Sequence, residues 1–483
     1  MLKDSLLLES TDIVEELCKR REIMRIITKK IVQPEFTKNV VPVELSDETM
    51  AKRKKALLVA MEEKEIDTVV IYGDREHGSN FEYFTGFISR FEEALLVIHQ
   101  NGQAFLLLGN ENTKMVQHAR LETQLIHVPF FSLPNQPMED DAPFKDYLTE
   151  AGIEKGQKVA VIGWKNFTSA VEENYKLFDL PYFIVDSLKQ VINDEAGLIN
   201  GADLLIGANN GIRTINNANE IAHYEYGATL AGRGILNTMN SVELGKTELE
   251  LAGNLAQFGQ PNTITTICAT GTRFTNATLY PRNKQVELGE TFSTSVGYKG
   301  GLSSRAAYVA ESKSDLPEAV SDYEEKVAKP YYSAFCTWLE KIHIGMAAGK
   351  LYEEIETALP QADYHWELNP GHFVADEEWM SSPFSENGNA EIKSGQLFQI
   401  DIIPRVAGYG GASCEDGVAI ADSELRYALE TEYPEVWERM VRRRTYLKQV
   451  LGIKLREEIL PLNDVLAYYR PYLLDRETAF CKE

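Results

Sequence analysis

A charged helical segment followed by a short apolar run is the feature that most limits how this chain can fold. Residues 49–64 are charged and helix-favouring, and residues 66–72 form a Val/Ile-rich run that ends at Gly73. Short apolar runs bounded by turn residues are typical of strands. A helix followed by such a strand predicts an alternating α/β arrangement.

The same pattern continues downstream. Residues 94–108 contain two apolar runs separated by Asn101-Gly102, which predicts a hairpin with a type I′ turn. Residues 158–162 and 182–185 are further β-rich runs, each followed by polar residues, and are expected to be strands.

A polar joint rich in Gly and Asn at residues 207–221 predicts a domain boundary near residue 206. We therefore expect one α/β domain at 46–205 and a second domain at 206–455. The second domain is expected to open with a helix whose apolar positions share one face, namely Ile221, Tyr224, Ala228, Ala231 and Ile235. Thr247 and Glu250 then have the spacing of a capping box at the start of another helix.

The two ends of the chain are expected to frame these domains. The chain has 483 residues, which at roughly 100–200 residues per domain predicts two or three domains. Apolar residues among charged neighbours at 11–32 have helical spacing, so residues 1–45 are interpreted as an N-terminal helical extension. Residues 456–483 are interpreted as a C-terminal tail.

Charge and cysteine content limit the partners and the compartment. The formal net charge of -24 disfavours nucleic acid and anionic membranes, and it favours small molecules, peptides or basic proteins. No window approaches the roughly 18 apolar residues of a membrane helix, and no signal peptide is evident. Five scattered cysteines suggest neither a disulfide framework nor a zinc site, which fits the cytoplasm.

Several segments together resemble the creatinase, prolidase and aminopeptidase P family. Residues 83–87 (YFTGF) resemble a segment of its N-terminal domain, and Ile212-Arg213 resemble the start of its catalytic domain. Gly371-His372, residues 395–401 (GQLFQID) and residues 414–416 (CED) resemble its active-site strands. The resemblance covers about residues 46–455. It implies an α/β (α+β) protein, with a creatinase-like N-terminal domain, a pita-bread domain of antiparallel sheet and surrounding helices, and a homodimer.

The resemblance also implies a metal site that this chain retains only in part. Metallopeptidases of the family hold two metal ions with two Asp, one His and two Glu. His372 matches the histidine, Asp401 stands where the first Glu is expected, and Glu415 matches the last Glu. A further family histidine should fall near Thr278, but no histidine lies between His223 and His343.

The two aspartates should lie in a stretch that contains no acid at all, residues 291–310. Ser295 is the expected occupant of the first position, and Ser303 or Leu302 that of the second. Four carboxylates can lie close together only when cations neutralise them, so losing two removes the reason for a second metal. A two-metal centre is not expected.

Two alternatives remain for His372, Asp401 and Glu415. They could hold a single divalent ion (Mn, Zn or Co) with open positions for water and substrate. Alternatively no metal is bound, and Arg305 or Lys299 pairs with the two carboxylates instead. Asp401 shares a strand face with apolar side chains, and a carboxylate in such a place needs a partner.

Other polar residues are candidates for substrate contact. Tyr298, Ser303 and Arg305 lie in or beside the stretch that lost its acids. Arg75 and His77 lie in a charged run after the strand at 66–72, in a domain that can reach the active site of a partner subunit in this family.

Taken together, the resemblance and the retained residues predict a hydrolase of a carbon–nitrogen bond. The substrate would be an Xaa-Pro peptide or a small amide or amidino compound, and His372, Asp401 and Glu415 would carry the chemistry. The alternative is a catalytically inactive pita-bread module that binds peptides or proteins.

Overall fold

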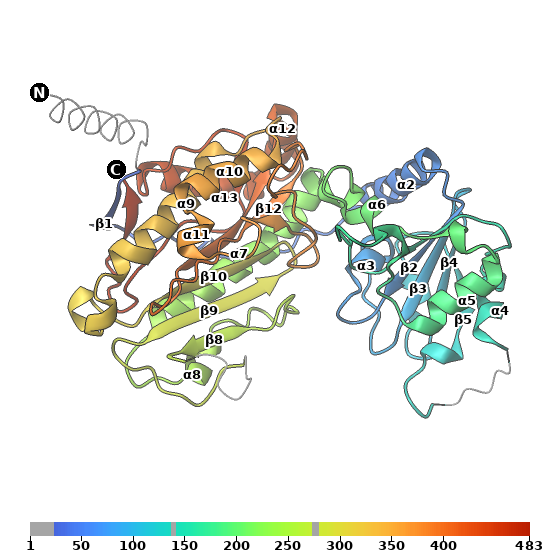
Figure 1. The fold of residues 1–483 in the computed structure, drawn as a ribbon, viewed down its shortest axis with the longest axis horizontal. Helices are drawn as coiled ribbons and strands as arrows, with labels where there is room; N and C mark the ends of the chain where they lie inside the picture. Colours follow the sequence, from blue (N-terminus) through green and yellow to red (C-terminus); the bar gives the residue numbers. More distant parts are fainter. Residues whose placement is uncertain (1–23, 137–141, 273–279) are drawn as a thin grey trace, which may run out of the picture.

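The protein consists of two domains, each built on its own sheet (Figure 1). The computed structural model describes residues 24–136, 142–272 and 280–483. The mixed α/β class and the order of the two domains confirm the fold predicted from the sequence.

The first domain has a mixed six-stranded sheet in the order β5-β4-β3-β2-β6-β7. Its strands are β2 (Thr68–Gly73), β3 (Ala94–His99), β4 (Ala104–Leu108), β5 (Gln124–His127), β6 (Val159–Ile162) and β7 (Leu198–Asn200). Side chains of β2 alternate between two cores because successive residues of a strand point to opposite faces. Val69 and Ile71 pack toward helices α2 (Asp47–Glu63) and α3 (Ser79–Thr85). Val70 lies in the core on the other face, under helices α4 (Phe144–Glu150) and α5 (Tyr182–Ile192).

Two local predictions in this domain are wrong. Residues 182–185 begin the helix α5, because the apolar positions continue to Leu188 and Ile192 with helical spacing. The hairpin of β3 and β4 is present, but its turn is not type I′. Only Gly102 has a positive φ, whereas a type I′ turn needs positive φ at both central residues.

The second domain has a seven-stranded antiparallel sheet in the order β11-β12-β13-β10-β9-β8, with β14 beside β13. Its strands are β8 (Ile267–Thr270), β9 (Thr291–Tyr298), β10 (Gly301–Tyr308), β11 (His372–Phe373), β12 (Leu397–Ile400), β13 (Ser413–Ile420) and β14 (Ile459–Pro461). The long helix α7 (Ala218–Ser241) runs along β9 and β10 (Figure 1), and its predicted apolar face is buried. The other helices of this domain are α8 (Glu248–Ala252), α9 (Lys329–Lys341), α10 (Ala348–Ala358), α11 (Gln361–Tyr364), α12 (Ser423–Glu432) and α13 (Pro434–Gln449), whereas α6 (Ala202–Ile206) lies beside α2 at the joint between the domains (Figure 1). The predicted capping box of Thr247 and Glu250 is present at the start of α8.

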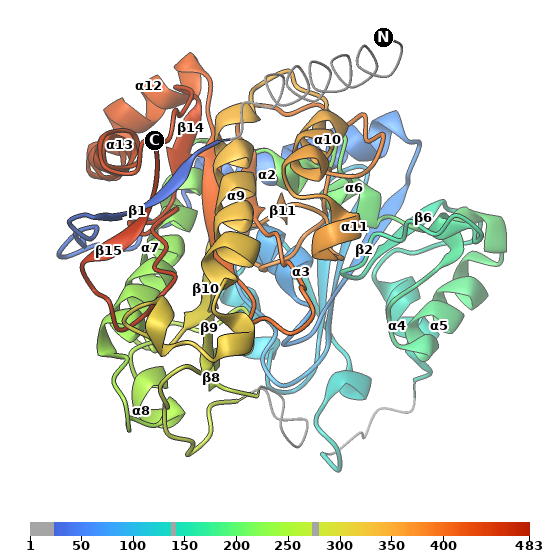
Figure 2. The same cartoon turned by 60° about the vertical axis from the view of Figure 1, so that its left-hand side comes forward.

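The ends of the chain differ from the expectation. Residues 1–23, with most of the predicted helical extension, lie outside the described residues. Residues 26–30 form a strand, β1 (Ile26–Lys30), which pairs with β15 (Thr478–Lys482) near the other end of the chain (Figure 2). Residues 456–483 are not a loose tail, because they contribute β14, β15 and many buried side chains to the second domain. In the described part of the chain, no helix is both long and apolar enough to cross a membrane.

Buried ion pairs join the two domains. Arg53 of α2 donates a hydrogen bond from Nε to Glu220 Oε1 of α7 at 2.8 Å. Arg213, which lies between the domains, donates to Glu377 Oε1 at 2.6 Å and to Asn80 Oδ1 at 2.7 Å. A buried charge is stable only when it is paired in this way. Buried ion pairs and hydrogen bonds of Arg53 and Arg213 therefore contribute to the contact between the two domains.

Candidate active site

Three neighbouring strands of the second sheet bring His372, Asp401 and Glu415 together. His372 begins β11, Asp401 follows the last residue of β12, and Glu415 lies in β13. The antiparallel register pairs His372 with Gln399, and Gln399 with Gly417, so the three side chains share one face. One ligand atom from each residue lies within 4.8 Å of the others, and all three residues are buried. Two ligand atoms 2.0–2.2 Å from one metal ion are at most about 4.4 Å apart, so the three side chains are near enough to share an ion after a small inward movement.

The imidazole of His372 is held in one orientation. Its Nδ1 lies 3.0 Å from the carbonyl oxygen of Phe373, and the Trp379 ring stacks on it with centroids 4.0 Å apart. Nε2 lies 3.2 Å from Glu378 Oε1, but without the alignment of a hydrogen bond. Nε2 is therefore the nitrogen available to a ligand in the cluster.

Burial and mutual repulsion change the pKa values of this cluster. Burial raises the pKa of Asp401 to about 6, although the nearby His372 opposes the shift. Burial and the charges of Asp401 and Glu378 raise the pKa of Glu415 well above its usual value. Burial would lower the pKa of His372, but the carboxylates of Glu378 and Asp401 raise it. Without a cation, the carboxyl groups of Asp401 and Glu415 therefore hold their protons to higher pH than usual.

A cavity of 680 Å³ opens beside the cluster. Among its lining residues are Glu378, Asp401 and Glu415, and no Lys or Arg of the described segments lines it. Three carboxylates face this cavity without a basic side chain. The arrangement is suited to a cation, either a metal ion or a positively charged ligand group.

Four serines, Ser293, Ser295, Ser304 and Ser413, line the same cavity. Ser295 of β9 is the cross-strand partner of Ser304 of β10, and Ser304 is in turn the partner of Glu415. Ser304 Oγ accepts hydrogen bonds from Ser295 Oγ at 2.7 Å and from Ser413 Oγ at 3.2 Å. The structure thus places Ser295 beside the cluster, as predicted. It places Ser304, rather than Ser303 or Leu302, opposite Ser295.

Arg305 and Ser303 point to the other face of β10, which corrects their predicted role in substrate contact. Arg305 Nη2 donates to Asp416 Oδ2 at 2.7 Å, and Ser303 Oγ donates to Asp416 Oδ1 at 2.7 Å. Residues 303 and 305 share a face because side chains alternate along a strand. Arg305 is fully buried there and forms no ion pair with the side chain of Asp401 or Glu415.

Tyr298 and Lys299 are also engaged elsewhere. The hydroxyl of Tyr298 donates to the carbonyl oxygen of Leu255, which lies in the core rather than in the cavity. Lys299 pairs with Glu82 of the first domain and lies 4.0 Å from Asp376. The predicted pairing of Arg305 or Lys299 with Asp401 and Glu415 is therefore wrong for the described structure.

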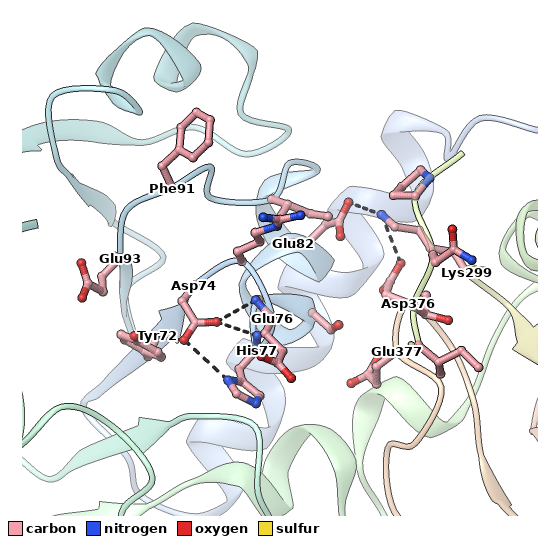
Figure 3. A pocket seen from close by; sticks show the side chains of 18 of the residues that line it. Tyr72, Asp74, Glu76, His77, Glu82, Phe91, Glu93, Lys299, Asp376 and Glu377 are labelled. Atoms are coloured by element: carbon pink, nitrogen blue, oxygen red, sulfur yellow. Dashed lines mark hydrogen bonds and ion pairs between the residues drawn. The ribbon is translucent and has the colours of Figure 1, made fainter. Parts of the chain in front are cut away.

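Arg75 and His77 lie away from the cluster, at a second cavity between the domains (Figure 3). Arg75 is exposed, and His77 stacks on Trp164 with ring centroids 4.8 Å apart. The position near Thr278, where a family histidine is expected, lies outside the described residues.

Sequence reasoning missed Glu378 as a member of the site. Glu378 lies in the acidic run 376–378 that follows His372, where it faces the imidazole, while Trp379 covers the ring. Trp379 was the available signal in the sequence, because a large aromatic residue within a charged loop indicates that part of the loop is buried.

An α/β domain followed by an antiparallel sheet with convergent His, Asp and Glu side chains defines a two-domain protein of the pita-bread class. Residues 53–202 match the family model of the Creatinase/Prolidase N-terminal domain. The chain thus has the architecture of the creatinase and prolidase family, as its sequence motifs predicted.

Solved structures with the same fold are prolidases and related peptidases. The prolidase from Pyrococcus horikoshii OT3 is 16% identical with a TM-score of 0.58, over 77% of this chain and 95% of that chain. The Xaa-Pro dipeptidase from Bacillus anthracis is 16% identical with a TM-score of 0.57, over 78% and 96%. Aminopeptidase P from Escherichia coli, in complex with substrate, is 13% identical with a TM-score of 0.52, over 78% and 93%. No curated protein sequence matches the chain.

Proposed function

We propose that this protein hydrolyses a carbon–nitrogen bond in a peptide or in a small amide or amidino compound, as an Xaa-Pro peptidase-like or creatinase-like enzyme. The observation that carries the proposal is a pair of unsatisfied atoms in the site. Asp401 Oδ1 is buried and has no hydrogen-bond partner among the described residues, and His372 Nε2 makes no aligned hydrogen bond, although Glu378 Oε1 lies 3.2 Å from it. Buried polar atoms are normally satisfied, so these two call for a bound group.

One divalent cation, Mn, Zn or Co, fits the donor set of His372, Asp401 and Glu415. Such a cation, when bound, polarises a carbonyl oxygen and makes water a better nucleophile. Three protein ligands leave positions open, as in catalytic sites. A second metal is not proposed, because Ser295 and Ser304 are neutral at the positions that face the cluster.

The protein's own side chains would orient both the site and its ligand. Phe373 and Trp379 hold the imidazole of His372 so that Nε2 faces the cluster. The hydroxyls of Ser295 and Ser304 would hydrogen-bond polar atoms of the substrate. The apolar walls at Ile267 and Leu302 would exclude water from the reacting bond.

Metal analysis and a substrate panel test this proposal together. Chelator-treated protein would be reloaded with Mn, Co or Zn and analysed for metal per chain. It would then be incubated with Xaa-Pro dipeptides, creatine and guanidino acids. We expect one bound ion and turnover of at least one class, with both lost in His372→Ala and kept in the exposed-residue control His365→Ala. Absence of turnover under every condition would contradict the proposal.

A second candidate function is an inactive module that binds peptides or basic proteins. It is favoured by the serines at Ser295 and Ser304, which leave the site without the carboxylates of the metallopeptidases. Peptide binding without turnover, unaffected by His372→Ala, would support this candidate. Turnover that depends on His372 would exclude it.

We also propose that the protein is a cytoplasmic homodimer. The buried free thiols of Cys268, Cys336, Cys414 and Cys481 are compatible with a reducing compartment. Light scattering on the purified protein would test the dimer, and fractionation of cells would test the compartment.

A further inference from the structure

A second cavity of 740 Å³ lies between the two domains (Figure 3). The first domain contributes residues around Asp74 and Phe91, and the second contributes Lys299, Asp376 and Glu377. Seven carboxylates line this interdomain cavity, against Arg75, Lys299 and one histidine. The cavity is therefore strongly acidic even for this acidic chain.

The floor of the interdomain cavity neutralises most of its own charge. Lys299 pairs with Glu82 and lies 4.0 Å from Asp376. The guanidinium of Arg213 binds Glu377 from behind, at 2.5 Å from Nη2 to Oε2. Lys299 is thus already paired with the floor, which leaves the exposed Arg75 as the one basic side chain of Lys or Arg type among the described lining residues that forms no ion pair.

The rim carboxylates lack basic partners. Glu76 and Glu93 form no ion pair with any described residue. Glu92 is 2% exposed; its Oε2 accepts a hydrogen bond from the Glu111 amide at 2.9 Å, but its Oε1 has no partner among the described residues. A buried carboxylate oxygen with no donor is costly, and a positively charged donor that enters the cavity would satisfy it.

An exposed aromatic ring stands at the same rim. Phe91 is 55% exposed and lies next to Glu92 and Glu93, and the guanidinium of Arg90 lies over its ring at 4.5 Å from the centroid. Lys and Arg side chains combine an aliphatic stem with a charged head, and they bind where an apolar surface adjoins acids. The rim thus matches both parts of such a side chain.

The interdomain cavity is adjacent to the cavity beside His372, Asp401 and Glu415, because Ile264 and Thr265 line both. A ligand that extends past these two residues would reach both cavities. We propose that the interdomain cavity is a subsite for a positively charged side chain, and that the preferred ligand is a short peptide with Lys or Arg at the end that lies over the first domain. This inference rests on the proposed function for the peptide's other end, but the binding preference is measurable without turnover.

Fluorescence anisotropy with labelled peptides tests the subsite. Three peptides of identical length would carry Lys, norleucine or Glu at one end, and mass spectrometry would verify that each stays intact. We expect the Lys peptide to bind about tenfold more tightly than the norleucine peptide, or about 1.4 kcal/mol, with the Glu peptide weakest. The preference should shrink at high salt, because the attraction is electrostatic.

Variants locate the effect in the cavity. Glu92→Gln and the double variant Glu76→Gln/Glu93→Gln should each reduce the preference for Lys several-fold, whereas the exposed control Glu122→Gln should not. The double variant changes partly or fully exposed side chains and should fold normally, so it keeps the test valid if Glu92→Gln is unstable. Equal binding of the Lys and norleucine peptides, or an unchanged preference in the double variant, would overturn the inference. If the Lys peptide is preferred but no peptide is hydrolysed, only the proposed activity is contradicted. If peptides are hydrolysed at rates that do not depend on their charge, only the subsite is contradicted.

Discussion

In the candidate site, the ionised form of Asp401 lowers the stability of the folded protein. Its pKa rises from an ordinary 3.8 to about 6 because the carboxyl group is buried. Between these values the folded protein keeps the proton while the unfolded chain loses it, so stability falls as pH rises from about 4 to 6 and stays low above that.

We therefore predict that Asp401→Asn stabilises the metal-free protein at pH 7.5 by about 1–3 kcal/mol, since two pKa units correspond to about 3 kcal/mol at most. Urea unfolding at pH 4 and pH 7.5 would measure the difference, which should nearly vanish at pH 4. The exposed control Asp363→Asn should show no such pH dependence. An Asn variant that is less stable than wild type at pH 7.5 would contradict the interpretation.

Ser295 and Ser304 allow the missing carboxylates to be restored. Their Oγ atoms lie 2.7 Å apart in the cavity beside Glu415. We predict that Ser295→Asp/Ser304→Asp raises bound Mn from one ion to two per chain, because five ligands with four carboxylates would again need two cations. The same variant should be less stable without metal, since like charges repel.

Elemental analysis after dialysis against Mn would give the stoichiometry. The triple variant that also carries His372→Ala serves as the control and should bind fewer ions than the double variant. A double variant that still binds a single ion would show that the two serines do not occupy ligand positions.

At the scale of elements, the turn between β9 and β10 sets the position of Lys299 and of both serine-bearing strands. Gly300 has φ of +98°, and a Cβ there would lie 2.1 Å from the carbonyl oxygen of Tyr224 in α7. We predict that Gly300→Ala costs about 3 kcal/mol or more, from left-handed backbone strain and a clash with a rigid helix.

Gly408 provides the matched control for that turn. Its φ is +87°, but nothing lies within 4 Å of an added Cβ. Gly408→Ala should therefore cost only about 1 kcal/mol, the backbone strain alone. Denaturant unfolding of the two variants would separate strain from contact, and equal losses would contradict the argument.

Sequence patterns predicted the elements well where one period was clear. The apolar face of α7, the hairpin of β3 and β4 and the cap of α8 all depend on short-range rules. Residues 182–185 could be interpreted either way, because four apolar residues do not distinguish a strand from the first turn of a helix.

The candidate site depends on strand register, and the sequence alone does not distinguish two registers that differ by one residue. A shift of one residue would turn Ser303, instead of Ser304, toward the cluster. In the observed register Arg305 lies on the opposite face, where it binds Asp416. The convergence of His372, Asp401 and Glu415 could be anticipated from family motifs. The approach of Glu378 could not, because a loop conformation places it there.

At the scale of the whole molecule, Arg213 connects the two domains. Its guanidinium is fully buried and binds Glu377, Asp376 and Asn80. We predict that Arg213→Ala lowers the free energy of unfolding by about 3–5 kcal/mol, because two carboxylates lose their buried partner. Calorimetry should then show separate transitions for the two domains.

The exposed pair of Arg405 and Glu367 is the matched control for this prediction. Its side chains are 73% and 66% exposed, so Arg405→Ala should cost less than about 1 kcal/mol. A loss of similar size in both variants would mean that burial does not decide the strength of these contacts.

The pairing of β1 with β15 has a consequence for how the protein is made. Lys30 Nζ donates to Glu477 Oε2 at 2.7 Å across a separation of 447 residues. At roughly 5–20 residues per second, β1 leaves the ribosome about 20–90 s before its partner exists. During that interval an unpaired strand edge is open to other chains. The first domain can fold while the second still lacks its last strand. During this part of synthesis, the unpaired edge of β1 is a site at which a chaperone could prevent aggregation.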